Sequence, residues 1–208
     1  TRDEAFCGMK EIPEESLVVN PDNNGIQNIV VWVKTGRRYT ELPEMELKPE
    51  KHTLANQSCR FQPHVVLAKV GDTIEVTNPD TIGHNAKFNG FNLDSNLTVP
   101  VGGSISVELE DAEPSVIGVE CNIHPLMKAR LLVIDNPFSA VSDENGVLEI
   151  KGLPAGMDIT FQANHETGGF DDLEIGGATV SRNRFELELK PGMNDMGVIE
   201  VPGDKFSE

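Results

Sequence analysis

The stretch VIGVECNIHPLMKARLLVI, residues 116–134, combines two strand patterns with a cluster of metal donors. VIGVE (116–120) and RLLVI (130–134) are short runs rich in β-branched residues, as expected of buried strands. The residues between them offer a thiol, an imidazole and a thioether, on Cys121, His124 and Met127. The stretch therefore predicts either a metal-binding loop between two strands or a chance cluster at a strand end.

Short strand patterns divided by Gly, Pro, Asn and Asp recur along the whole chain, and none of it reads as a long helix. IVVWV (29–33) is a continuous apolar run, whereas ISVELE (105–110) alternates with period two. Further strand patterns are VVLAKV (65–70), TIEVTN (73–78), VLEI (147–150), MDITFQA (157–163) and FELELK (185–190). This density of short strands predicts an all-β fold of antiparallel sandwich type.

The composition excludes some classes of partner. The chain has 208 residues and a formal charge of −17, which argues against binding to nucleic acid or to anionic lipid. Hydrophobic residues make up 38% of the chain, too many for a disordered acidic tail. No apolar run approaches the roughly 20 residues that span a bilayer. The N-terminal TRDEAFCGMK is not a signal peptide, so an exported form would have lost one.

A second histidine would complete the donor set of the loop. Thiolate, imidazole and thioether ligands suit copper that cycles between Cu(I) and Cu(II). The candidate is His84 in NPDTIGHNAKF (78–88), expected in the loop after a strand and 37 positions before Cys121. If both loops emerge at the same end of a sandwich, His84 meets the other three donors. Taken singly, each of the four residues is more simply a core or surface side chain.

The two loops together resemble those of the cupredoxin, or blue copper, family. The resemblance covers about residues 50–135 and rests on VGDTIEVTNPDTIGHNAKF (70–88) and VECNIHPLMKARLLVI (119–134). The C-x2-H-P-x-M loop is similar to that of amicyanin, and the Gly-His-Asn is similar to that of azurin. The resemblance implies a Greek-key cupredoxin sandwich whose metal ligands are His84, Cys121, His124 and Met127. It also implies supporting roles for Asn85, which ties the loops together, and for Pro125, which stiffens the ligand loop.

This resemblance implies one type 1 copper per chain and outer-sphere electron transfer rather than catalysis. The ring edge of His124 would be the electron port, within an apolar patch that includes Pro125, Leu126 and Ile82. A redox protein such as a c-type cytochrome or a dehydrogenase would be the partner. The alternatives are a copper delivery or sensing module of the cell envelope, a mononuclear copper enzyme, and an interaction module with a vestigial site.

The cysteine count bears on the compartment. If Cys121 is a metal thiolate, Cys7 and Cys59 remain as an even pair; the alternative is three unrelated reduced thiols. Azurin carries a disulfide between its N-terminus and a later strand, so the resemblance implies a Cys7–Cys59 bond. Closing a loop of about fifty residues would stabilise the fold by roughly 4 kcal/mol, less any strain. Such a bond would place the protein in the periplasm, in the wider cell envelope or outside the cell.

The C-terminal part has a second resemblance. SDENGVLEIKGLPAGMDITFQA (142–163) is similar to the carboxypeptidase-regulatory, or transthyretin-like, β-sandwich. This unit follows a cupredoxin core in bacterial envelope proteins labelled methylamine-utilisation-like. The expected divisions are N-terminal strands in 1–49, a cupredoxin domain in 50–136 and the second β unit in 137–208. The N-terminal strands are expected to pack with the C-terminal unit, or else the copper sandwich is simply extended by extra strands.

The remaining histidines have less specific signals. His64, at the start of a predicted strand, is either structural or part of a second metal or proton-linked site. His165 lies in a polar, glycine-rich segment and is expected to be solvated. The protein is not expected to be an enzyme.

Overall fold

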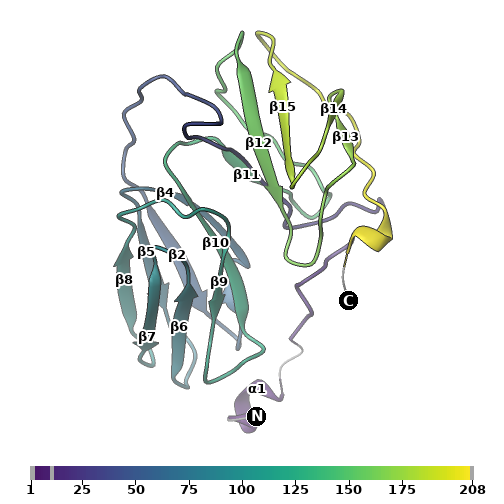
Figure 1. The fold of residues 1–208 in the computed structure, drawn as a ribbon. Helices are drawn as coiled ribbons and strands as arrows, with labels where there is room; N and C mark the ends of the chain where they lie inside the picture. Colours follow the sequence, from purple (N-terminus) through teal and green to yellow (C-terminus); the bar gives the residue numbers. More distant parts are fainter. Residues whose placement is uncertain (1–2, 10–11, 207–208) are drawn as a thin grey trace. The chain divides into compact units, whose positions relative to one another are not determined.

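The computed structural model describes residues 3–9 and 12–206, in two compact units that each have their own core. The first unit comprises residues 1–15 and 46–137, and the second comprises 16–45 and 138–208. Figure 1 shows both units as β-structures. The all-β fold class is therefore confirmed: a β-sandwich with an additional, smaller β unit.

The first unit contains two sheets. One sheet has the strand order β4-β10-β9-β6-β7, and the other has the order β3-β2-β5-β8. The elements of this unit are α1 (Glu4–Cys7), β2 (Lys51–Asn56), β3 (Phe61–Gln62), β4 (Val65–Lys69), β5 (Thr73–Thr77), β6 (His84–Asn89), β7 (Asp94–Val99), β8 (Ser104–Glu108), β9 (Ile117–Glu120) and β10 (Lys128–Ile134). Buried side chains from both sheets, such as Ile74 of β5 and Leu131 of β10, belong to one hydrophobic cluster.

Two strand pairs in this unit are parallel, so the sandwich is not antiparallel throughout. β2 lies parallel to β5, and β4 lies parallel to β10. Parallel neighbours require a crossover connection, and here the chain passes to other strands before it returns. The remaining ladders, including β9–β10 and β6–β9, are antiparallel.

The second unit is built around a sheet with the order β11-β1-β12-β15. Its elements are β1 (Val30–Val33), β11 (Ser139–Val141), β12 (Asp158–Asn164), β13 (Glu174–Ile175), β14 (Ala178–Thr179), β15 (Arg184–Glu188) and the 3-10 turn η1 (Gly203–Lys205). β1 is buried along its whole length because it lies between β11 and β12. The N-terminal segment 16–45 thus completes the sheet of the C-terminal unit.

The structure differs from the sequence patterns at the beginning of the chain, at VLEI (147–150) and at β2, β6 and β7. The segment up to and including Glu15 belongs with the first unit, where Cys7 forms the expected disulfide with Cys59. VLEI (147–150) is not a strand; Leu148 and Ile150 pack against the core without joining a ladder. β2, β6 and β7 were not signalled, because their sequences mix polar and apolar residues without a clean period.

The described residues contain no helix with the length and apolar character needed to cross a membrane.

Candidate metal centre

The loop 121–127 connects two antiparallel neighbours and is closed by its own backbone. β9 ends at Glu120, which faces Lys128, the first residue of β10. The Cys121 N–H donates to the Met127 carbonyl at 3.2 Å, and the Met127 N–H donates to the His124 carbonyl at 2.9 Å. These bonds hold a short loop in which Cys121 and His124 are both buried.

His84 reaches the same place from another strand. It is the first residue of β6 rather than a loop residue as expected, and it is 0% exposed. β6 pairs antiparallel with β9 so that Lys87 faces Glu120. Continuing this register toward the start of β6 brings His84 alongside the loop that follows β9.

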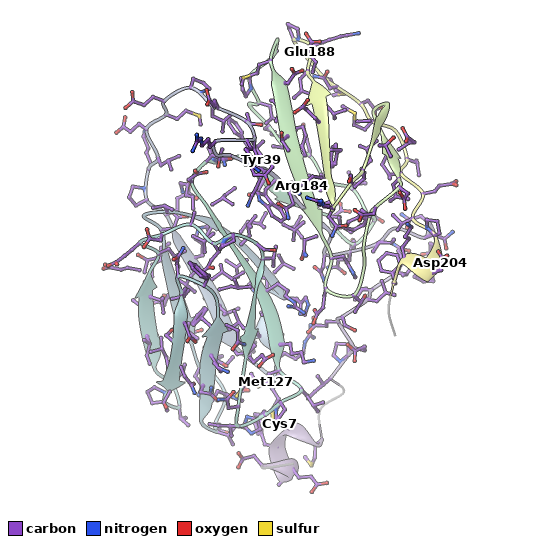
Figure 2. The ribbon with its side chains drawn as sticks, in the orientation of Figure 1. Cys7, Tyr39, Met127, Arg184, Glu188 and Asp204 are labelled. Carbon is purple, nitrogen blue, oxygen red and sulfur yellow. A yellow bond between two sulfur atoms is a disulfide. The ribbon has the colours of Figure 1, made fainter. Side chains whose placement is uncertain are left out.

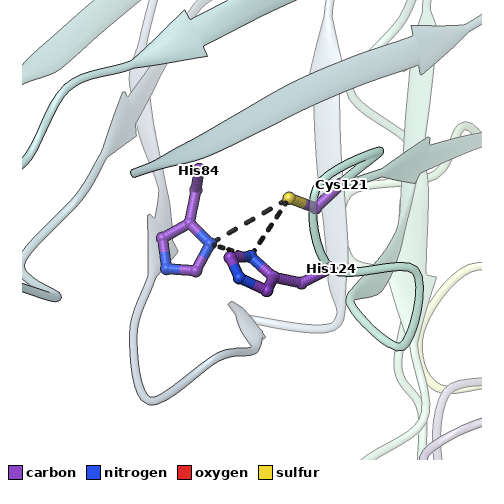
Figure 3. A group of neighbouring side chains, drawn as sticks. All are labelled: His84, Cys121 and His124. Carbon is purple, nitrogen blue, oxygen red and sulfur yellow. Dashed lines mark hydrogen bonds between the residues drawn. The ribbon is translucent and has the colours of Figure 1, made fainter. Parts of the chain in front are cut away.

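Three donor atoms converge at this point, as Figure 3 shows. The Cys121 Sγ lies 4.0 Å from Nδ1 of His84 and 3.8 Å from Nδ1 of His124. The two Nδ1 atoms are 3.0 Å apart. Imidazole nitrogen and thiolate sulfur bind an ion such as zinc at about 2.0 and 2.3 Å, so donors of one ion stand no more than about 4.3 Å apart. All three distances meet that condition.

The outer nitrogen of each ring shows which way the lone pairs point. Nε2 of His84 is 3.0 Å from a carboxylate oxygen of Asp80, and Nε2 of His124 is 3.1 Å from one of Asp3. A carboxylate accepts, so each Nε2 acts as the N–H donor and each Nδ1 is left with its lone pair. Two lone pairs that face each other at 3.0 Å beside a thiol could together bind a cation. The residues present therefore fit a metal ion.

The charge state of His84 is also suited to a ligand. Burial lowers the pKa of the His84 imidazole, and the neighbouring His124 lowers it further, while hydrogen bonding to Asp80 acts in the opposite direction. The net lowering favours the neutral imidazole, which is the form that binds metals.

Asn85 connects the two parts of the site. Its Oδ1 accepts the Ile123 N–H at 3.2 Å and lies 3.4 Å from the Cys121 sulfur. Its Nδ2 donates to Oδ1 of Asn96 on β7 at 2.7 Å. These contacts link β6 and β7 to the ligand loop, which is the kind of contact that the sequence resemblance implies for this residue.

Met127 is buried at the end of the ligand loop, and Figure 2 labels it within the first unit. Pro125 and Leu126, between His124 and Met127, are exposed. The resemblance implies an electron port at the ring edge of His124, which stays a prediction. His124 is 4% exposed, and Asp3 of the N-terminal segment lies against its Nε2.

The two other histidines of interest lie outside this centre. Nδ1 of His64 is 3.9 Å from a carboxylate oxygen of Glu15, which also pairs with Arg60. His165 is 4% exposed rather than solvated, because its ring packs edge-on against Phe206. Among the described residues, neither belongs to a group of converging metal donors.

Sequence reasoning missed Asp80 and Asp3. Asp80 stands four residues before His84 in the quoted ligand stretch, a spacing that brings the two side chains together across a turn. Asp3 carries no local signal, since 121 positions separate it from His124.

The fold and the donor set describe an all-β protein with a buried His-Cys-His group that could hold a metal ion. No family model matches the sequence, and no curated protein matches it. Among solved structures, the chain is similar to a reduced amicyanin variant at 21% identity and a TM-score of 0.35, covering 39% of this chain and 80% of that one. It is similar to a purple cupredoxin from Nitrosopumilus maritimus at 20% identity and a TM-score of 0.33, covering 39% and 98%. A Cu-containing nitrite reductase from Thermus scotoductus gives 21% identity and 0.37, covering 48% of this chain and 26% of that one.

Proposed function

We propose that this chain is a mononuclear type 1 copper protein that acts in outer-sphere electron transfer. Its copper ligands would be His84, Cys121, His124 and Met127. One observation carries the proposal: Nδ1 of each imidazole and the Cys121 sulfur converge within 3.0 to 4.0 Å, with both Nε2 atoms engaged by carboxylates.

The chemistry of the donors favours copper over harder ions. A thiolate and a thioether favour Cu(I), and imidazole is accepted by both oxidation states. Bound copper would supply one-electron oxidation and reduction. The protein's own part is to hold the donors in one arrangement, and the hydrogen bonds of the ligand loop and of Asn85 do this.

The burial of the donors supports electron transfer over substrate chemistry. His84, Cys121 and His124 are at most 4% exposed, so a substrate in bulk water does not reach the donor atoms. An electron, in contrast, crosses a few ångströms of protein without contact between donor and acceptor. The same burial favours a resident ion over one that is readily handed to another protein, as a delivery module requires.

The setting of the protein follows from two further features. The Cys7–Cys59 disulfide favours an oxidising compartment, such as the periplasm or the exterior of the cell. The charge of −17 favours a redox partner that presents a basic face, because opposite charge accelerates encounter. A c-type cytochrome or a dehydrogenase with such a face is the kind of partner we expect.

The test is absorption and electron paramagnetic resonance spectroscopy of the protein loaded with one Cu(II). We expect an intense visible thiolate-to-copper band that disappears on reduction and returns on oxidation. A Cu(II) complex without that band would contradict the type 1 assignment. Rapid loss of the ion to a chelator, without electron exchange with a cytochrome, would favour the delivery or sensing alternative.

A further inference from the structure

Each imidazole of the centre has a carboxylate on its outer side. Asp80 comes from the turn before β6, and Asp3 comes from the N-terminal segment. Their Oδ2 atoms lie 3.0 Å and 3.1 Å from Nε2 of His84 and His124, respectively. A carboxylate that accepts the outer N–H of a ligand histidine fixes the tautomer and the ring orientation.

Asp80 is itself held from the backbone. Its Oδ1 accepts the Ser58 N–H at 2.7 Å, and its Oδ2 accepts the Cys59 N–H at 2.9 Å. Asp80 is 6% exposed, and its backbone N–H donates to Oδ1 of Asn78 at 3.1 Å. Because these bonds involve neither histidine, Asp80 has a defined position whether or not His84 is bound to a metal.

The backbone that holds Asp80 is connected covalently to the segment that carries Asp3. Cys59 is bonded to Cys7, the last residue of α1. The Asp3 carbonyl accepts the N–H groups of Phe6 and Cys7 at 2.9 and 3.0 Å, which fixes Asp3 relative to Cys7. The Cys59 sulfur also lies within 4.8 Å of ligand atoms of Asp80 and His84. The disulfide therefore connects the backbone that binds the Asp80 carboxylate with the segment that carries Asp3.

We propose that Asp3 and Asp80 are positioning residues for the two ligand imidazoles, and that the Cys7–Cys59 disulfide is the frame that holds both carboxylates in place. This inference rests on the proposed function for the identity of the ion. The orientation of the two rings by the carboxylates is expected in the metal-free protein as well. Asp3 orients His124 alone and Asp80 orients His84 alone, whereas the disulfide acts on both.

The decisive measurement uses nitrogen NMR of the histidine rings in the metal-free protein. In the native chain we expect the Nε2 of both His84 and His124 to carry a hydrogen. Asp3→Asn should release this preference at His124 only, and Asp80→Asn at His84 only. A merely structural role would disturb both rings or neither, so this crossed pattern identifies positioning.

The matched controls are Glu4→Gln and Asp94→Asn, which each remove one charge from an exposed carboxylate of the same unit. Both should leave the two rings as they are in the native chain. If a control shifts a ring as strongly as its partner variant does, the effect is one of net charge and the proposal is overturned.

Metal binding supplies the second readout. Loss of such an outer carboxylate lowers metal affinity by about 10- to 100-fold, so we expect that range for Cu(II) in Asp3→Asn and Asp80→Asn, against less than about 2-fold in the controls. Unchanged affinity together with unchanged rings would overturn the proposal. A native protein with the expected ring hydrogens but no thiolate-to-copper band would contradict the proposed function and leave the positioning of the rings intact.

The disulfide is tested with Cys7→Ser combined with Cys59→Ser. The nitrogen spectra of both rings should then change. Cu(II) affinity should fall at least as much as in whichever of Asp3→Asn and Asp80→Asn has the smaller loss. Native ring spectra in the folded double variant would overturn the role of the disulfide. If the double variant does not fold, the ring spectra of the native chain after reduction of the Cys7–Cys59 bond decide instead: both rings should change, and native spectra would overturn the role of the disulfide.

Discussion

Both units of this protein bury a histidine, but the two sites have different chemistry. In the first unit, His84 faces a thiol, a second imidazole and a carboxylate. In the second unit, His165 packs edge-on against Phe206 with ring centroids 5.2 Å apart, and its Nδ1 accepts the Thr167 N–H at 3.3 Å. Burial of a histidine is therefore not a sign of a metal site. The convergence of soft donors on one point is the sign.

The cores of the two units also differ in the kind of side chain that they bury. The second unit has an aromatic and aliphatic core in which the rings of Phe161 and Phe185 stack at 5.3 Å. The first unit places Cys121 and Met127 in its hydrophobic cluster, with His84 and His124 buried as well. Packing accounts for the side chains of the second core, whereas the first core also contains a group of converging donors that could hold a metal ion.

Cys121→Ser should change the properties of the first unit most, because it removes the sulfur donor. A hydroxyl is a poor ligand for copper, so the visible thiolate-to-copper band should be lost completely while circular dichroism still shows a folded β protein. Survival of the colour would refute the ligand assignment. His165→Gln, a matched change of a buried polar side chain in the other unit, should keep the band and the copper stoichiometry.

Phe161→Ala in the second unit should lower stability strongly without loss of copper. Removing a buried aromatic ring that stacks on Phe185 should lower the free energy of unfolding by about 3–5 kcal/mol, as followed by urea titration. The copper band of the folded protein should not change. Val198→Ala, at a side chain that is 91% exposed, should change stability by less than about 0.5 kcal/mol.

A smaller effect concerns pH and a buried carboxylate of the first unit. Burial by itself would raise the pKa of Asp72, but hydrogen bonds from Lys69, His52 and the Glu50 N–H outweigh it and lower the pKa to about 2. A depressed pKa stabilises the fold above the unfolded value near 3.8, and this stabilisation is lost as pH falls through about 2. The ionised group therefore contributes roughly 2 kcal/mol at neutral pH.

Asp72→Asn should remove this pH dependence. Unfolding titrations between pH 5 and 2 should show a loss of stability on acidification that is smaller by about 2 kcal/mol in the variant than in the native chain. The exposed Asp94→Asn serves as the comparison and should follow the native curve. Parallel curves for Asp72→Asn and the native chain would show that this carboxylate does not stabilise the fold.

The smallest effect is expected within the ligand loop itself. Leu126 lies between His124 and Met127 but is 68% exposed, so Leu126→Ser should shift stability by no more than about 0.5 kcal/mol. The copper band should be unchanged, as measured by absorption. Loss of the band would show that the loop depends on this side chain for its conformation and not only on its backbone hydrogen bonds.

Much of the fold was predictable where the signal is local. Continuous or alternating apolar runs identified β1, β5, β10 and β12. An alternating run fits a strand with one buried face, and a continuous run fits a strand that is buried on both faces. VLEI failed because apolar residues can pack on a core without pairing. His84 and His165 were misplaced, one as a loop residue and the other as a solvated one, because strand ends and burial both depend on distant partners.

The candidate ligand loop was recognisable in the sequence, since Cys121, His124 and Met127 lie within seven positions whose strand-flanked, proline-containing pattern is local. The strand patterns likewise predicted the all-β class, and the cysteine count left Cys7 and Cys59 as an even pair. The folded structure was needed to show that Asp80 and Asp3 lie on the outer side of the two imidazoles and that His124 is buried. The physical reason is distance along the chain: contacts between residues 3 and 124 arise from packing of the whole unit, and no periodicity in the sequence records them.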